Sequence, residues 1–370
     1  MAENKQNEYP NVPPLRFPEF IDEWNRGKVG DDCDIYMCKR IFADQTNDLD
    51  GVPFYKIGTI GGDPDAYISQ ELFEQYKRKY NYPKKGEVLI TCAGTVGKAI
   101  VFDGKDAYFQ DSNIVWISNP TSNLSNDFLY YFINRVDWSK LNSTTITRIY
   151  NDDLRKLKIA FPSIDEQKKI TQLFYLLDRR IAMQSKLIEQ LESLMGGIIE
   201  RLTAQSPNVR IADCLECHSS TLQENQLNED GNYRVYGANG VCGYTDSSAI
   251  NGDSILIVKD GSGVGNVSFA TGEYSVIGTS NYLTAKSGHN LRYLYYCLKK
   301  FNFAPYKTGM AIPHIYFKDY GKAKIYCPAH DEQERIANIL SKIERKMVIE
   351  RSITDHYIEQ KQYLLQQLFI

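Results

Sequence analysis

Long hydrophobic runs are missing from this chain. No stretch of the sequence reaches the roughly 18 consecutive apolar residues that a membrane-spanning helix requires. Residues 1–8 are polar and contain no apolar segment of the kind found in signal peptides. The 8 cysteines, in a 370-residue chain without an export signal, are typical of reduced thiols. The sequence therefore predicts a cytoplasmic protein that does not contact a membrane.

An excess of positive charge is also missing. The formal net charge is −3 and the isoelectric point is about 6.0. Proteins that bind nucleic acids through their overall charge are usually basic. Any nucleic-acid-binding face of this chain must therefore come from local clustering of lysine and arginine.

Catalytic motifs are scarce. No G-x-S-x-G nucleophile motif, Walker loop or N-P-P-[YF] methylation motif occurs. The glycine-rich segment 261–265 is followed by a predicted strand at 267–270, whereas a nucleotide-binding loop requires a helix there. Cys214, Cys217 and His218 have the spacing of a haem attachment site, but that chemistry needs export. A zinc site would need a second ligand pair at similar spacing, and none occurs. We expect no catalytic residue, no cofactor site and no metal site in this chain.

What the chain does contain is an internal repeat. The segment 161–170, F-P-S-I-D-E-Q-K-K-I, returns at 327–336 as C-P-A-H-D-E-Q-E-R-I. The offset, from Asp165 to Asp331, is 166 residues, and Ile149-Tyr150 matches Ile315-Tyr316 at the same offset. Copies of this length are domain-sized, so the pattern predicts two similar halves, each a globular domain followed by a helix.

The segments after each D-E-Q predict long helices with an apolar stripe. In the first, apolar residues fall on two sevenfold ladders, interrupted by Gln184. The ladders are Ile170, Leu177, Leu191 and Ile198, and Phe174, Ile181, Ile188, Met195 and Leu202. At about 39 residues, or about 58 Å, each helix needs a partner. The partner is either its own globular domain or, as we favour, the other helix.

Details within these helices leave alternatives open. Ser163 and Glu166 have the spacing of a capping box, and Asp331 with Glu334 is the corresponding candidate in the second copy. Gly196-Gly197 indicates either a frayed helix end or a close crossing of backbones. Later in the helices, Ile188-Glu-Gln matches Ile358-Glu-Gln at an offset of 170 residues instead of 166. The difference of four residues is about one helical turn.

The globular parts predict a mixed α/β (α+β) fold. Short β-rich runs alternate with glycine and asparagine turns over 25–160, and residues 208–325 follow the same order with different side chains. The predicted boundaries are 1–161 for the first globular domain, 162–205 for the first long helix, 206–327 for the second globular domain and 328–370 for the second long helix.

This organisation resembles the specificity subunit of type I restriction–modification systems. The matching features are the P-x-x-D-E-Q-x-x-I helix entries at 162–170 and 328–336, L-R-F-P-E-F at 15–20, Y-G-A-N-G-V-C-G-Y at 236–244, and the turns G-T-V-G-K and G-V-G-N. The resemblance covers essentially the whole chain. It implies two target-recognition domains, each reading one half of a bipartite DNA sequence. It also implies two helices packed as an antiparallel coiled coil, with internal pseudo-two-fold symmetry.

The resemblance implies a division of labour as well. This subunit would be non-catalytic, and two methyltransferase subunits would dock on its helices and methylate adenine with S-adenosylmethionine. Restriction (motor) subunits would use ATP and Mg²⁺ for cleavage. Two other functions stay open, a coiled-coil protein scaffold without DNA readout and a two-domain DNA-acting enzyme. DNA binding by the chain together with its methyltransferase distinguishes the three.

Candidate DNA-binding residues are the polar tips of glycine-rich turns and of loops that differ between the copies. In the first half they are Lys56, Thr95, Lys98, Asn113 and Arg148. In the second half they are Arg234, Asn239, Asn266, Asn281 and His314. Each could equally be an ordinary solvated loop residue.

Overall fold

The structure is a computed structural model that describes residues 11–121, 123–140 and 148–370. The chain divides into two compact units. The first unit comprises Met1–Met183 and Thr354–Ile370, and the second comprises Gln184–Ile353.

The first unit is built around a four-stranded antiparallel sheet. Its order is β2 (Asp34–Met37), β9 (Ile114–Ser118), β6 (Val88–Thr91) and β7 (Ala99–Val101). All four residues of β6 are buried, because both faces of the sheet are covered. Val88 and Ile90 enter one hydrophobic core while Leu89 enters another, as the alternation of side chains along a strand requires.

Smaller elements complete the first unit. A second sheet has the order β3 (Thr46–Asn47), β5 (Tyr67–Ile68), β4 (Val52–Tyr55) and β8 (Tyr108–Phe109), and a two-stranded sheet pairs β1 (Asn25–Lys28) with β10 (Lys158–Phe161). The helices are α1 (Val29–Asp32), α2 (Gln70–Lys79), α3 (Asn126–Arg135), α4 (Asn151–Lys156) and the first half of α5 (Ile164–Thr203), with 3₁₀ turns at Ala43–Gln45 and Trp138–Lys140.

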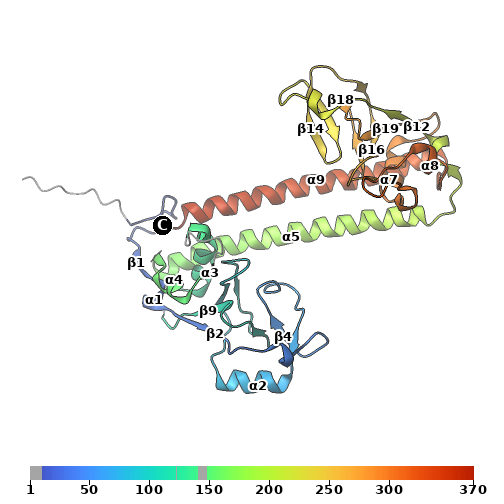
Figure 1. The fold of residues 1–370 in the computed structure, drawn as a ribbon. Helices are drawn as coiled ribbons and strands as arrows, with labels where there is room; N and C mark the ends of the chain where they lie inside the picture. The colour runs from blue at the N-terminus through green and yellow to red at the C-terminus, as the bar shows by residue number, and fades with distance from the viewer. Residues whose placement is uncertain (1–10, 122, 141–147) are drawn as a thin grey trace, which may run out of the picture. The chain divides into compact units, whose positions relative to one another are not determined.

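Helix α3 connects the sheet to α5 (Figure 1). The side chain of Ser125 caps α3 by accepting a hydrogen bond from the backbone N–H of Phe128. The Tyr131 ring lies 5.0 Å from the Phe174 ring of α5, and its hydroxyl donates to Asp178 at 2.9 Å. These contacts hold the globular part of the first unit on the first turns of its long helix.

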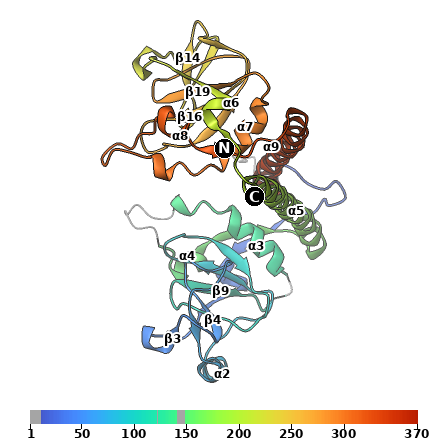
Figure 2. The same ribbon diagram turned by 90° about the vertical axis from the view of Figure 1, so that its right-hand side faces the viewer.

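The second unit repeats this plan (Figure 2). Its main sheet has the order β12 (Leu215–Ser219), β19 (Ser280–Ala285), β16 (Ser254–Val258) and β17 (Val267–Ala270). Its second sheet has the order β14 (Gly240–Thr245), β13 (Tyr233–Gly237), β18 (Glu273–Val276) and β15 (Ile250–Asn251), and β11 (Val209–Arg210) pairs with β20 (Lys324–Ile325). The helices are α6 (Ile211–Cys214), α7 (Leu291–Lys299), α8 (Phe317–Tyr320) and the first part of α9 (His330–Gln367), with 3₁₀ turns at Glu224–Gln226 and Ala304–Tyr306.

Corresponding backbone hydrogen bonds occur in the two units. The N–H of Val29, at the start of α1, donates to Leu157 O, and the N–H of Ile211, at the start of α6, donates to Ala323 O, both at 2.9 Å. Strand β4 pairs in parallel with β8, as β13 does with β18. The prediction of a mixed α/β fold made of two similar domains is confirmed. The units differ around the second sheet, where the first carries α2 and the second carries the β13–β14 hairpin.

The glutamine of each D-E-Q motif fastens the long helix to its globular domain. Gln167 is fully buried, and its Nε2 donates to Pro162 O at 2.9 Å and to Asn123 O at 2.7 Å. Its Oε1 accepts from the N–H of Ser125, the capping residue of α3, at 2.8 Å. In the second unit Gln333 repeats two of these bonds. It donates to Pro328 O at 2.8 Å and accepts from the N–H of Asn290, the capping residue of α7, at 2.9 Å.

Each unit contains one half of α5 and one half of α9, and the two halves pack antiparallel. In the first unit Phe174 lies 6.0 Å from Phe369, ring to ring, and Lys361 forms an ion pair with Asp178. In the second unit the Gln184 side chain donates to Glu350 at 2.7 Å. Gln184, the polar residue that interrupts the predicted stripe, therefore has a partner. No residue of the two predicted ladders of α5 is exposed, which agrees with a buried stripe.

The predicted helix caps are only partly confirmed. Ser163 precedes α5 and its hydroxyl accepts from the Glu166 N–H at 3.5 Å, as predicted, whereas the Glu166 carboxylate accepts two hydrogen bonds from Arg16 at 2.7 Å. In the second copy α9 begins at His330, so Asp331 lies inside the first turn and Ala329 precedes the helix.

Neither alternative for the glycine pair Gly196-Gly197 in α5 is correct. A Cβ atom placed at Gly196 or Gly197 would meet nothing within 4 Å, which excludes a close backbone crossing within the described structure. The helix continues to Thr203, so the pair does not mark a frayed end.

Candidate nucleic-acid interface

All five candidate residues of the first unit lie at one edge of its sheets, where the strands end in turns. We define the first loop edge as residues 56–62, 92–98, 110–113 and 148–150. Backbone bonds join these segments: Cys92 N–H donates to Asn113 O at 2.7 Å, Ile149 N–H to Cys92 O at 2.9 Å, and Gln110 N–H to Tyr55 O at 2.9 Å. Residues far apart in the sequence are thereby placed on one surface.

The lysines of the first loop edge are held by local contacts. Lys98 Nζ donates to Ile60 O, which ties the turn 92–98 to the loop 56–62. Lys56 pairs with Asp65 at 3.0 Å, and both side chains are largely exposed. Such an exposed pair contributes little to stability and can open for a phosphate. Thr95 is exposed at the tip of the same turn, between two glycines that have positive φ.

Arg148 lies beside a cleft. One guanidinium nitrogen donates to Ser112 O at 3.1 Å, and the guanidinium lies 5.8 Å from the centre of the Tyr150 ring. The two residues line a hollow of about 370 Å³ together with Met37, Ser112, Ile149, Asn151 and Asp152. Asn113 is half-buried and follows Ser112 in the sequence, immediately before β9.

Three of the five candidates of the second unit converge in the same way. We define the second loop edge as residues 238–242, 259–266 and 314–316. Asn239 is exposed in the β13–β14 turn, and Asn266 is exposed at the end of the glycine turn 261–265. His314 Nδ1 lies 2.9 Å from Asp260 Oδ1. Asn239 and Asp260 line one hollow of about 250 Å³ with the glycine turn.

The other two candidates lie in strands, so their placement in loops was wrong. Arg234 is an exposed residue of β13, paired with Tyr244 and Tyr274, at the opposite end of that strand from Asn239. Asn281 is 5% exposed within β19, and its Oδ1 accepts from the Ser219 hydroxyl at 2.9 Å. Because β19 begins at Ser280, Asn281 lies inside the strand and its side chain faces the interior. A contact from Asn281 to a DNA base would require that pair to open.

The most closely matched parts of the two edges are their corners. Residues 148–150 and 314–316 correspond at the repeat offset, and the N–H of Ile149 and of Ile315 each donates to a residue of the adjoining turn at 2.9 Å. In the first corner Arg148 lies over Tyr150; in the second, His314 lies over Tyr316, with ring centres 6.4 Å apart. The two corners therefore share a backbone bond but carry different polar side chains, an arginine in the first unit and a histidine in the second.

The two corner tyrosines were missed among the candidates. Tyr150 is 61% exposed and Tyr316 is 48% exposed, so both rings are accessible to a ligand. The sequence does contain a signal for these tyrosines, because Ile149-Tyr150 and Ile315-Tyr316 match at the repeat offset of 166 residues. An exposed tyrosine beside a cation can donate to a phosphate or pack on a sugar or base.

Two patterns set aside from the sequence can be located in the structure. The glycine turn 261–265 is followed by strand β17, not by a phosphate-binding helix. Cys217 and His218 lie in β12, where the His218 ring stacks on Tyr282 at 4.8 Å and its Nε2 lies 2.9 Å from the Thr284 hydroxyl. Within the described ranges, no helix is long and apolar enough to cross a membrane.

Comparison with known proteins identifies the relatives of this chain. The model of the family described as "Type I restriction modification DNA specificity domain" matches twice, over residues 21–193 and 207–356. The chain is 47% identical over 172 residues to a Haemophilus influenzae protein named as a type I restriction enzyme specificity subunit. That match covers 46% of this chain and 44% of the relative. The chain is also 21% identical over 253 residues to the EcoprrI specificity subunit of Escherichia coli, covering 61% of this chain and 62% of that one.

One solved structure supports the fold over almost the entire chain. It is the type I restriction–modification S subunit from M. genitalium, with a TM-score of 0.71 and 18% identity. The match covers 97% of this chain and 99% of the M. genitalium chain. By contrast, the matches to the two curated relatives span less than two thirds of the length of either.

Proposed function

Because this chain belongs to the family of type I restriction modification DNA specificity domains, we propose that it is the DNA-specificity subunit of a type I restriction–modification complex. Each unit reads one half of a bipartite target in double-stranded DNA. The first loop edge reads one half-site and the second loop edge reads the other. The observation that carries this proposal is the pair of corners at 148–150 and 314–316, which have the same backbone bonds but different polar groups.

Two classes of contact follow from the chemistry of these edges. Lysine and arginine side chains position the protein on phosphates, which weakens with added salt. Lys56, Lys98 and Arg148 supply this on the first edge. Asparagine can bind adenine through two hydrogen bonds in the major groove, and arginine can bind guanine in the same way. We assign Asn113 on the first edge, and Asn239 and Asn266 on the second, to base readout.

The second edge is less basic than the first. Lys98 of the first turn corresponds to Asn266 of the second, since the N–H groups of Thr91 and Val258 donate to their carbonyls at 3.0 Å in each case. The side-chain amide of Asn266 replaces a positive charge at that position. We therefore assign more of the phosphate binding to the first edge and more of the neutral hydrogen bonding to the second.

The chemistry belongs to partner subunits in this proposal. Methyltransferase subunits dock on the paired helices and methylate adenine with S-adenosylmethionine, and restriction (motor) subunits use ATP and Mg²⁺. We infer that this chain contributes neither catalytic residues nor a cofactor to these reactions, and that the complex acts in the cytoplasm.

Exchanging one domain tests the proposal. Residues 208–325 are replaced by the corresponding domain of a relative with a different target, and methylated positions are mapped across the genome of cells that carry the chimaera. One half-site should change while the other is kept. The reciprocal exchange of residues 25–160 is the matched control, and it should change the opposite half-site. If either chimaera alters both half-sites, or neither, the assignment of one reader to each unit is wrong.

A further inference from the structure

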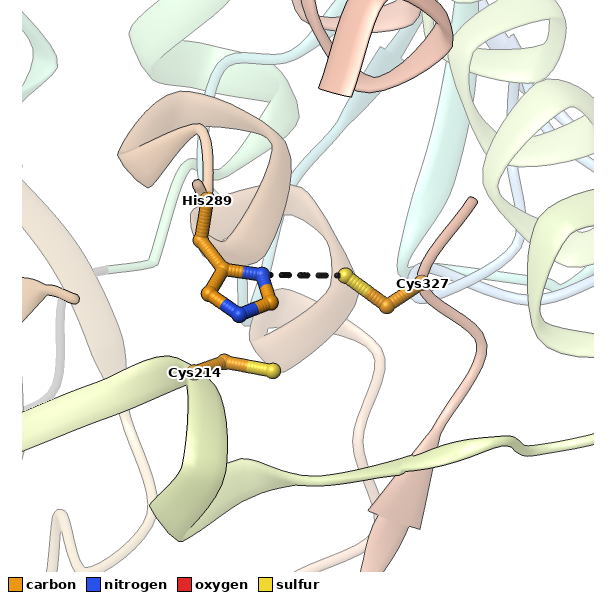
Figure 3. Close-up of side chains that lie close together, drawn as sticks. All are labelled: Cys214, His289 and Cys327. Atoms are coloured by element: carbon orange, nitrogen blue, oxygen red, sulfur yellow. Dashed lines mark hydrogen bonds between the residues drawn. The ribbon is translucent and has the colours of Figure 1, made fainter. Parts of the chain in front are cut away.

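Three potential metal ligands that DNA recognition does not use meet in the second unit (Figure 3). Cys214 is the last residue of α6, His289 lies in the turn between β19 and α7, and Cys327 lies between β20 and α9. One ligand atom from each lies within 4.8 Å of the other two. Cys327 Sγ is 3.5 Å from His289 Nδ1. The fold thus brings together two thiols and an imidazole from three separate segments.

The spacing of the group suits a tetrahedral cation. Zinc lies about 2.3 Å from a cysteine sulfur and about 2.0–2.1 Å from a histidine nitrogen, and tetrahedral angles then separate sulfur and nitrogen by about 3.6 Å and two sulfurs by about 3.8 Å. The observed sulfur–nitrogen distance of 3.5 Å matches the first value. The other separations, at most 4.8 Å, need side-chain movements of only about 1 Å to reach these values.

The electrostatics of the group favour a bound thiolate. A hydrogen bond from the Cys214 thiol, together with the neighbouring His289, lowers the pKa of Cys327 to about 6 against the opposing effect of burial. The same hydrogen bond, together with burial, raises the pKa of Cys214. The thiolate is the form of cysteine that binds metals, and a cation would release the remaining proton.

The group is open to solvent on one side, and the backbone of one ligand is held in place. Cys214 and Cys327 are buried, whereas His289 is partly exposed, which leaves one side for a water ligand. Asn208 holds the backbone of Cys327 in place by two hydrogen bonds, at 2.8 Å to its N–H and 2.9 Å to its carbonyl. Partners that orient a ligand in this way are typical of metal sites.

The first unit shows that the fold does not need these side chains. The positions of Cys214, His289 and Cys327 correspond to Asp32, Leu124 and Phe161, because α1 matches α6 and the capping residues Ser125 and Asn290 match. Leu124 and Phe161 are buried members of the first hydrophobic core. Apolar side chains take the places of His289 and Cys327 there, and the half-buried Asp32 takes the place of Cys214, so the two thiols and the imidazole of the second unit call for a different explanation.

We propose that Cys214, His289 and Cys327 bind a divalent cation of the zinc type, with water as the fourth ligand. A ligand set of two thiolates and an imidazole binds zinc in preference to magnesium or calcium, which bind oxygen ligands. The cation would join α6, the turn before α7 and the segment that enters α9. It would thereby fasten the second recognition domain to its long helix, next to the bonds that Gln333 makes.

The test uses the full-length chain, reduced and stripped of metal, and titrated with Co²⁺ as a spectroscopic probe. Thiolate ligands give Co²⁺ strong near-ultraviolet charge-transfer absorption, and tetrahedral geometry gives intense visible bands. We expect one equivalent of Co²⁺ to bind with both signatures, and one equivalent of Zn²⁺ to displace it. Zn²⁺ should also slow amide hydrogen exchange in 208–214, 286–290 and 326–333.

Variants decide whether these three residues are the ligands. His289→Leu and Cys327→Phe install the side chains that the first unit carries in the same places, so folding is expected to survive and is checked by circular dichroism. Each should weaken Co²⁺ binding by more than the roughly 10–100-fold typical of removing a residue that only supports a ligand. Cys242→Ser removes an exposed thiol elsewhere in the unit and serves as the matched control, with no expected change.

The outcomes are distinct. Loss of the thiolate absorption in both variants and its retention in Cys242→Ser support the site. If the wild-type chain gives no thiolate absorption at stoichiometric Co²⁺, or if either ligand variant binds as the wild type does, the site is rejected. Neither result depends on DNA binding, so this inference stands or falls separately from the proposed function.

Discussion

Replacing the buried glutamine of the first D-E-Q motif should loosen the attachment of its recognition domain. In Gln167→Leu the side-chain volume is nearly kept, but Pro162 O, Asn123 O and the Ser125 N–H lose their partner. A buried polar group left unpaired costs about 1–3 kcal/mol. Pro162 is buried and should show the full cost, whereas Ser125 and Asn123 are partly accessible to water. We expect a loss of about 3 kcal/mol in the local stability of α3 on α5.

Amide hydrogen exchange measures this loss directly. Because the chain has two units, a single unfolding free energy would mix their responses, while exchange reports on each segment. A change of about 3 kcal/mol corresponds to about hundred-fold faster exchange at Ser125 and in α3. Gln333→Leu, which removes two bonds instead of three, should give a smaller effect in α7.

The matched control is Gln172→Leu, the same substitution at an exposed position on α5, which should leave exchange in α3 unchanged. Exchange of Ser125 at the wild-type rate in Gln167→Leu would show that the buried glutamine does not hold the domain. The motif would then need another explanation.

Three further predictions concern DNA recognition. Lys98→Ala should weaken binding to all duplexes alike and reduce the salt slope by about one unit; an unchanged slope in salt titrations would remove Lys98 from the interface. Tyr150→Ala should weaken binding about ten-fold through its own half-site, as expected for one hydrogen bond to a phosphate, and Tyr316→Ala through the other; equal effects of both on each half-site would contradict separate readers. Inserting four residues after Lys186 adds about 6 Å of helix and about 40° of rotation, so methylation mapping should show a spacer longer by one to two base pairs at about 3.4 Å each; an unchanged spacer with full activity would show that the helices do not measure the DNA.

Much of the fold could be predicted from the sequence because its signals are local and occur twice. The short β-rich run at 88–91 predicts a strand, and β6 is one. Gln184 interrupts the apolar stripe of α5, and the structure explains it because its side chain donates a hydrogen bond to Glu350 of α9. The sequence shows where the stripe is interrupted but not which residue lies opposite.

The candidate site was less predictable because the direction of a side chain depends on register. A shift of one residue turns a side chain to the other face of a strand. Asn113 precedes its strand and stays at the edge, whereas Asn281 lies inside its strand and is buried. The cysteines and histidine of the candidate metal site come from segments that no spacing motif joins, so only the fold could reveal them.

The division between scaffold and contact groups explains how such a chain could change its target without losing its fold. In each unit a buried glutamine joins the start of the long helix to the capping residue of the helix that supports the sheet. One corresponding backbone bond, donated by Ile149 in the first corner and by Ile315 in the second, attaches each corner to its loop edge. None of these bonds uses the side chains of Arg148, His314, Lys98 or Asn266. Substitutions at these four positions should therefore change the contacts that each edge makes with DNA, through phosphate affinity at Lys98 and Arg148 and through base readout at Asn266, while leaving the hydrogen bonds that hold each domain on its helix intact.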